Sequence, residues 1–116
     1  GETAARAAAG ALEHLAVAQT ANIAAALERT AAAGYWSVAL DAAARQPYWA
    51  QDFRGPTVLV IGAEGAGLHR LVRERCDFAV SIPLAPGPAS LNASAAAAVA
   101  LFEVVRQRSA ARTPAR

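Results

Sequence analysis

Residues 55–108 decide the fold, and they read GPTVLVIGAEGAGLHRLVRERCDFAVSIPLAPGPASLNASAAAAVALFEVVRQR. A run of apolar, β-branched residues opens this stretch and predicts a buried strand, because strands covered on both faces lack an alternating pattern. The pattern divides the stretch into strand 58–61, glycine turn 62–67, helix 68–75, strand 78–84, proline loop 85–89 and helix 91–108. This order predicts an α/β fold with a ligand site at the ends of strands.

The sequence before this stretch continues the alternation of helices and strands. The expected elements are an Ala-rich helix 3–12, a short strand 15–20, a helix that Asn22 caps and that runs to Ala33, and a strand 35–40. Gly34 is well placed to end the second of these helices, since glycine readily adopts the left-handed conformation found there. Residues 42–54 are expected to form a loop with several aromatic side chains. These aromatics could stack on bases, but packing over the sheet edge is the preferred interpretation.

The composition is that of one compact domain. The chain has 116 residues, of which 55% are hydrophobic and 17% charged, and this argues against a disordered protein. No apolar run approaches the roughly 18 residues of a membrane-spanning helix. The single Cys excludes an intramolecular disulfide, so we expect a cytoplasmic protein without a membrane partner. The chain contains no Met, at position 1 or elsewhere, and we expect it to be a piece of a longer protein.

The glycine turn gives the first chemical indication. Gly62, Gly65 and Gly67 form the pattern G-x-x-G-x-G between a strand and a helix. Residues without a Cβ let the backbone turn sharply and approach a ligand closely. The dinucleotide fingerprint requires G-x-G-x-x-G instead, and the phosphate-binding loop requires a Lys that this chain lacks. A nucleotide-dependent dehydrogenase therefore fits the coarse order of elements but fails the fingerprint.

Several motifs together resemble a known family. GAEGAGL at residues 62–68, SIPL at 81–84 and SLNASAAAA at 90–98 resemble the second and third motifs of the SpoU (TrmH-like) branch of the SPOUT superfamily. The resemblance continues upstream through AAAGALEHLAVAQTANIAAALE and GYWSVALDA, so it covers nearly all of the chain. Members of this family are knotted RNA ribose 2′-O-methyltransferases that use S-adenosyl-L-methionine. The first motif of the family, an Asn and an Arg, has no match here.

The resemblance implies a SPOUT-type α/β knot, in which a parallel sheet has flanking helices and the C-terminal segment forms a trefoil knot. By this comparison residues 1–108 are a partial catalytic domain that lacks its N-terminal part, and residues 109–116 are a disordered tail. The helix from Leu91 would then belong to the knot and help to build a homodimer. Its many Ala residues suit such a role, because small side chains let helices approach closely.

The resemblance also implies the site residues, with no metal among the ligands. The catalytic residues would be Glu64, Ser90 and Asn92, and the cofactor-binding residues would be Gly62, Gly65, Ile82, Leu84 and Leu91. Structural roles compete with some of these assignments. Glu64 could instead complement a helix dipole, and Leu84 could belong to the core. Either Ser90 or Asn92, but not both, could cap the last helix.

Three further residues have side chains that could carry chemistry. Asp41 follows a predicted strand, where it could contact a ribose hydroxyl or an amine, but capping the next turn is at least as plausible. Cys76 could accept a methyl group, although a small packed residue is the preferred interpretation. His14 has no Cys, Asp or second His nearby in the sequence, so we expect a structural or surface role for it.

The leading hypothesis is therefore methyl transfer from S-adenosyl-L-methionine to a ribose 2′-hydroxyl of RNA. The substrate would be rRNA or tRNA, with an rRNA guanosine preferred, and the enzyme would be a homodimer formed through the knot region. Because the first motif is absent, we expect this chain alone to be inactive. The alternative is a non-catalytic SPOUT-like module that binds cofactor or RNA without transferring a methyl group.

Overall fold

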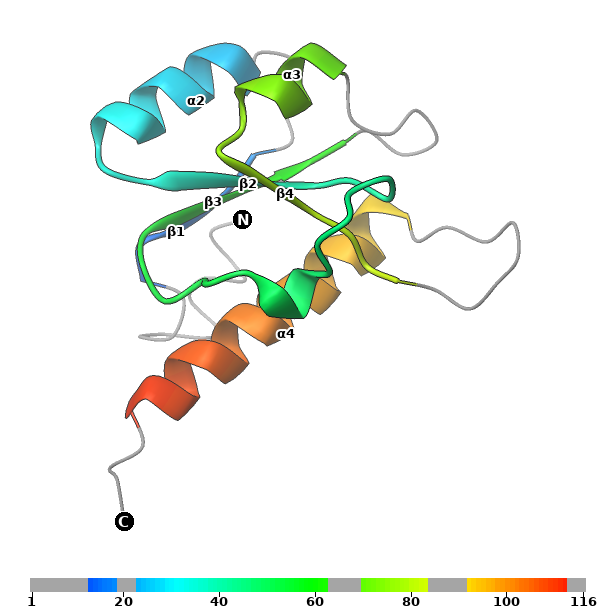
Figure 1. Cartoon of the computed structure of the whole chain (residues 1–116). Coiled ribbons are helices and arrows are strands. Elements are labelled where there is room, and N and C mark those ends of the chain that lie inside the picture. Colours follow the sequence, from blue (N-terminus) through cyan, green and yellow to red (C-terminus); the bar gives the residue numbers. More distant parts are fainter. Residues whose placement is uncertain (1–12, 19–22, 63–69, 84–91, 113–116) are drawn as a thin grey trace.

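The computed structural model describes residues 13–18, 23–62, 70–83 and 92–112. These residues form four strands, three helices and a short 3-10 helix (Figure 1). The strands are β1 (Leu15–Ala18), β2 (Trp36–Leu40), β3 (Thr57–Ile61) and β4 (Phe78–Val80). The helices are α2 (Ile23–Ala32), α3 (Arg70–Arg75), α4 (Ala93–Arg112) and the 3-10 helix η1 (Tyr48–Ala50).

The four strands form one parallel sheet in the order β1-β3-β2-β4. Helices α2 and α3 cover one face of the sheet and α4 crosses the other (Figure 1). Strand β3 lies inside the sheet and is buried at every position, which explains the uninterrupted apolar run at residues 58–61. The predicted parallel sheet with flanking helices is confirmed. The trefoil knot stays a prediction, because residues 84–91, which lead into α4, lie outside the described residues.

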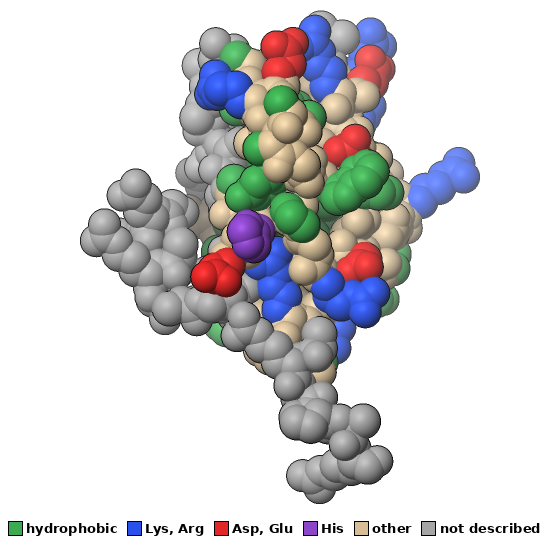
Figure 2. All heavy atoms as spheres, turned by 90° about the vertical axis from the view of Figure 1, so that its left-hand side faces the viewer, with side chains coloured by type: hydrophobic (Ala, Val, Ile, Leu, Met, Phe, Trp, Pro, Cys, Tyr) green, Lys and Arg blue, Asp and Glu red, His purple; other side chains and the backbone are tan. Residues whose placement is uncertain are grey.

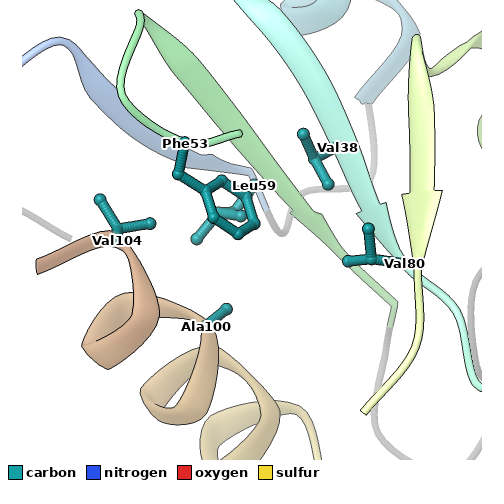
Figure 3. Packing of buried hydrophobic residues seen from close by; sticks show 6 residues of the cluster. All are labelled: Val38, Phe53, Leu59, Val80, Ala100 and Val104. Carbon is teal, nitrogen blue, oxygen red and sulfur yellow. The ribbon is translucent and has the colours of Figure 1, made fainter. Parts of the chain in front are cut away.

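The main core lies between the sheet and α4. It contains six buried hydrophobic residues from three strands, one loop and the helix: Val38, Phe53, Leu59, Val80, Ala100 and Val104 (Figure 3). Ala100 lets α4 approach the strands, and Phe53 from the loop before β3 fills the space beside it (Figure 3). A second cluster on the opposite face joins Leu27 of α2 to alternate residues of β3. This two-sided burial fixes the positions of the strand ends.

Polar side chains of α4 bind the loop that precedes β3. Gln107 accepts a hydrogen bond from the Phe53 amide at 2.7 Å and donates one to the Gln51 carbonyl at 2.7 Å. Arg108, which is 8% exposed, donates to the carbonyls of Phe53, Gly55 and Glu13. The helix is therefore attached to the rest of the molecule by specific hydrogen bonds as well as by its Ala-rich apolar face.

The element boundaries differ most from the predicted ones at the ends of β4 and α4. Strand β4 ends at Val80 rather than at residue 84, since Ser81 forms only an isolated bridge, with Pro47. Helix α4 continues to Arg112 rather than ending at Arg108. The expected end of α2 is confirmed, because Gly34 has a φ of 90°, a conformation that glycine adopts without strain. The predicted helix 3–12 and the Asn22 cap lie outside the described residues.

Candidate functional site

The candidate site lies at the carboxyl ends of β2, β3 and β4. Leu40, the last residue of β2, is in register with Ile61 of β3 on one side and with Val80 of β4 on the other. The residues that follow these strands therefore leave the sheet beside one another. Gly62 follows β3, and Asp41 follows β2 between the ends of the two neighbouring strands. This edge of a parallel sheet is where α/β proteins bind ligands.

Gly62 and Ile82 are the predicted cofactor residues that the structure describes at this edge. Both are half-buried, so a backbone group at residue 62 and an apolar side chain at residue 82 are available to a ligand. Glu64, Gly65, Leu84 and Leu91 lie outside the described residues, as does Ser90. Their predicted roles stay predictions.

The residue before Ile82, Ser81, is held by two backbone hydrogen bonds, and these bonds position Ile82. The Ser81 amide donates to the Gln46 carbonyl at 2.8 Å, and the Tyr48 amide donates to the Ser81 carbonyl at 2.8 Å. These two bonds form the isolated Pro47–Ser81 bridge, which joins the residue after β4 to the loop that follows β2. The loop from Asp41 to Tyr48 thus supports the segment that carries Ile82.

Asn92 caps α4. Its side-chain Oδ1 accepts a hydrogen bond from the Ala95 amide at 2.8 Å, and its carbonyl accepts one from the Ala96 amide at 2.9 Å. The capping role that the sequence left open between two residues is thus held by Asn92. The residue is exposed, and a cap needs only the oxygen of its amide group. The Asn92 amide nitrogen can therefore serve a ligand without loss of the cap.

Asp41 caps a turn, as the sequence suggested, and also forms an ion pair. Its Oδ1 accepts a hydrogen bond from the Ala43 amide at 3.0 Å, which closes the turn after β2. Its Oδ2 lies 3.0 Å from Nη1 of Arg73 on α3. The ion pair joins residues 32 positions apart, and no sequence spacing indicated it.

Cys76 is a packed residue and does not belong to the site. It precedes β4 at the end of the sheet where the strands begin, and it packs against the cluster of Leu27, Val58 and Val60. Its thiol donates to the Val72 carbonyl at 3.3 Å. Burial raises the pKa of this thiol to about 11, although a hydrogen bond with Ser37 acts in the opposite direction. A thiol at this position and with this pKa is a poor methyl acceptor.

His14 and the aromatic loop fit their structural interpretations, with one exception. His14 is exposed in a left-handed turn with a φ of 56°, and its carbonyl accepts a hydrogen bond from the Thr57 amide. Phe53 is fully buried and Tyr48 packs against the core, which confirms the packing role. Trp49 is the exception, because 55% of its surface is exposed. Within the described ranges there is no group of three or more His, Cys, Asp or Glu residues that could hold a metal ion.

The opposite end of the sheet presents a different surface. Figure 2 views the face at which the strands begin, where hydrophobic side chains gather among charged ones. Trp36 and Phe78 are both exposed there, at 58% and 40%, and their ring centroids lie 5.9 Å apart.

None of the helices that the structure describes is long and apolar enough to cross a membrane.

Comparison with known protein families agrees with the sequence motifs and with the geometry at the strand ends. The model of the SpoU rRNA Methylase family matches residues 1–102. The chain belongs to the SpoU family. It is 44% identical over 105 residues to the 23S rRNA (guanosine-2′-O-)-methyltransferase RlmB of Pseudomonas syringae. That alignment covers 90% of this chain and 42% of the relative, so the chain spans about two fifths of the relative's length.

Solved structures of SpoU proteins share the fold. The SpoU methyltransferase AviRb of Streptomyces viridochromogenes superposes with a TM-score of 0.69 at 41% identity, over 79% of this chain and 37% of AviRb. AviRb in complex with the cofactor AdoMet gives a TM-score of 0.66 at 42% identity, over 74% of this chain and 33% of AviRb. The fold described here therefore matches part of the SpoU methyltransferase AviRb.

Proposed function

We propose that the protein carrying this chain transfers a methyl group from S-adenosyl-L-methionine to a ribose 2′-hydroxyl of RNA. The observation that carries the proposal is the register that places the ends of β2, β3 and β4 side by side, with the SpoU motif residues Gly62 and Ile82 following two of these strands. Membership of the SpoU family supplies the type of reaction. A related SpoU methyltransferase has been solved with AdoMet bound.

The described residues suit the adenosine part of this cofactor. Gly62 follows β3 and Ile82 follows β4, with β2 between these two strands, and both residues are half-buried. They offer a backbone polar group and an apolar side chain at the same end of the sheet. Adenine is bound by this combination of apolar walls and a few fixed hydrogen-bonding groups. The cofactor would supply a methyl group on a positively charged sulfur. We assign its binding to Gly62, Gly65, Ile82, Leu84 and Leu91.

The chain's task in the reaction is to orient the attacking hydroxyl. Displacement at a methyl group requires that the incoming oxygen lie in line with the leaving sulfur, and alignment of this kind contributes strongly to rate. We assign this positioning to Glu64, Ser90 and Asn92. Asn92 suits the role because its backbone is fixed at the start of a 20-residue helix while its side chain is exposed. The hydroxyl must also lose a proton as it attacks. The family resemblance assigns this part of the reaction to the Arg of the first motif.

The RNA substrate is an rRNA or a tRNA, and we favour an rRNA guanosine. The relative from Pseudomonas syringae is named for that substrate. We further propose that the protein works in the cytoplasm, as a homodimer formed through the knot region. Phe102 on α4 supports the dimer, because 77% of this large apolar side chain is exposed.

A non-catalytic SPOUT-like module is the second candidate. Such a module would bind S-adenosyl-L-methionine or RNA and leave the RNA unmethylated.

Two measurements on the protein that carries this chain separate the candidates. Calorimetry would detect binding of S-adenosyl-L-methionine, and transfer of tritium from labelled cofactor to rRNA would detect catalysis. Binding together with transfer supports the enzyme, whereas binding without transfer supports the module. Gly65→Val tests the cofactor site, since an added side chain would block close approach of the ligand. Unchanged affinity in a folded Gly65→Val protein would contradict the assignment of the glycine turn.

A further inference from the structure

The carboxylate of Asp41 connects two sides of the candidate site. The backbone amide of Asp41 donates a hydrogen bond to the Val80 carbonyl at 2.9 Å, which continues the ladder between β2 and β4. Its carbonyl accepts from the Ala44 amide at 3.0 Å, and its Oδ1 accepts from the Ala43 amide. Oδ2 is directed to Arg73 of α3. The amide, the carbonyl and Oδ1 of Asp41 therefore hold the backbone around the strand ends, and Oδ2 holds α3.

Helix α3 depends on such contacts because it has only six residues. A helix this short gains little from its own hydrogen bonds, and its position is set by packing. Val72 packs it against the cluster beneath α2, on the side of the sheet away from α4. The pair between Arg73 and Asp41 fixes the helix to the edge at which the strands end. The side chain of Asp41 is 15% exposed and that of Arg73 is 38% exposed, so the pair is partly shielded from water.

The same carboxylate acts toward Ile82 through the backbone. The turn that Asp41 caps leads directly into residues 46–48, whose hydrogen bonds hold Ser81. Displacement of Asp41 would thus disturb the support of Ile82 and the attachment of α3 together. On the other side of β2, Leu40 is in register with Ile61 of β3, and Gly62 follows Ile61 directly.

We propose that the Asp41–Arg73 ion pair positions the strand-end segments for S-adenosyl-L-methionine. The two residues act as positioning residues, through α3 and through the turn after β2, and neither is a ligand of the cofactor. This inference rests on the proposed function. It assigns the ion pair a role in cofactor affinity beyond its contribution to the stability of the fold.

The first test is calorimetric titration of S-adenosyl-L-methionine into variants of the protein that carries this chain. Arg73→Gln breaks the pair, whereas Arg73→Lys keeps a positive charge near Asp41. Asp41→Asn also breaks the pair but retains the Oδ1 acceptor of the turn. Arg70→Gln is the matched control, because it removes the same charge from the same helix. Arg70 is 74% exposed and lies 3.6 Å from Glu74 in a surface pair.

We expect Arg73→Gln and Asp41→Asn each to weaken binding about tenfold, while Arg73→Lys stays within about threefold of the parent. Arg70→Gln should bind as the parent does. The double variant Asp41→Asn with Arg73→Gln should be no weaker than either single variant, because the interaction can be lost only once. Full additivity would overturn the inference, and so would a loss confined to Asp41→Asn, since that pattern indicates a direct contact of Asp41 with the cofactor.

The second test is hydrogen exchange of the protein without cofactor, which does not depend on binding. Peptides that cover α3 and residues 80–83 should exchange faster in Arg73→Gln than in Arg70→Gln, and peptides from α2 should not change. Equal exchange in the two variants would overturn the inference. If the parent itself binds no S-adenosyl-L-methionine, the proposed function fails. If the parent binds and Arg73→Gln binds equally well, the inference alone fails.

Discussion

At the scale of single residues, Asn92 combines a structural and a proposed catalytic role. Its Oδ1 accepts the hydrogen bond of the Ala95 amide and so begins α4, which leaves the amide nitrogen for a ligand. The two roles use different atoms of one side chain. Substitutions can therefore separate them.

The first prediction compares Asn92→Asp with Asn92→Ala. Aspartate retains the capping oxygen but has no amide donor, so Asn92→Asp should keep the parent's stability and lose methyl transfer. Alanine removes both, and loss of a cap costs about 1 kcal/mol of stability. Urea unfolding and RNA methylation by the protein that carries this chain measure the two effects. Parent-like turnover in Asn92→Asp would contradict the catalytic assignment.

The second prediction concerns the thiol of Cys76. Because its pKa is about 11, above the ordinary value of 9.0, the folded state holds the proton more tightly than the unfolded state. The resulting contribution to stability is complete below pH 9 and is lost as the pH rises toward 11. We expect slow alkylation by iodoacetamide at pH 8, and a drop in urea midpoint between pH 8.5 and 10.5 that is smaller in Cys76→Ser. Rapid alkylation of the folded protein would contradict this account.

At the scale of elements, much of the fold was predictable because its strands are short apolar runs between glycines, prolines and helices. The run 58–61 became β3, and Gly34 ended α2 as expected. The end of β4 was misplaced because Ile82 and the apolar residues beside it read like a strand. The strand ends where its partner β2 ends, because Leu40 is the last residue paired with β4. Ser81 bridges the distant Pro47 instead, and hydrophobic pattern does not encode where a partner strand ends.

The candidate site was predictable only through the family resemblance. Three separated motifs identified Gly62, Ile82 and Asn92, while the residue types alone were compatible with turns, core packing and a helix cap. Arg73 was missed because its partner, Asp41, lies on another element. Ion pairs of this kind depend on the sheet order, which becomes known only from the structure.

The third prediction concerns the hydrogen bonds that attach α4 to the loop before β3. Gln107→Ala would leave the Phe53 amide and the Gln51 carbonyl without their side-chain partner, and an unsatisfied buried group costs roughly 1–3 kcal/mol. Ser94→Ala is the control on the same helix, because Ser94 is exposed and a surface substitution there should cost little stability. Urea unfolding of both variants tests the difference. Equal losses would show that the loop is held by other contacts.

Low pH should weaken the attachment of α4 to the loop before β3. The hydrogen bond from Arg106 lowers the pKa of Glu103, and a further bond from Gln107 acts in the same direction. This carboxylate therefore stabilises the folded state above its ordinary pKa of 4.5, and the contribution is lost as the pH falls below that value. Glu103→Gln should flatten the decline of stability between pH 6 and pH 3. An unchanged decline would assign it to other groups.

At the scale of the whole molecule, activity should require more than this chain supplies. The fourth prediction is that the 116-residue chain gives no 2′-O-methylation of rRNA with tritiated cofactor, because it has no counterpart of the first-motif Arg. A full-length relative that carries the first motif serves as the positive control in the same assay. Methylation by the chain would show that this motif is dispensable and would overturn the proposed mechanism.

The fifth prediction concerns assembly through α4. Phe102→Asp places a charge where 77% of an apolar side chain is exposed, so it should favour the monomer if this surface is covered in a dimer. Light scattering at several concentrations measures the change in mass. Trp49→Asp is the matched control, because Trp49 is 55% exposed and lies on η1 rather than on the proposed interface helix. A parent that is monomeric throughout would contradict the proposed homodimer.

The buried guanidinium of Arg108 has a consequence for the order in which the molecule folds. It joins the carbonyl of Glu13, 95 positions earlier in the chain, to those of Phe53 and Gly55. On the ribosome, where the N-terminal end emerges first, this junction cannot form until nearly all of α4 has been synthesised. Strand β1 meanwhile waits for β3, its partner from later in the chain. We therefore expect β1 to be fixed only once α4 has emerged, and the apolar faces of the strands stay exposed until that helix packs on them.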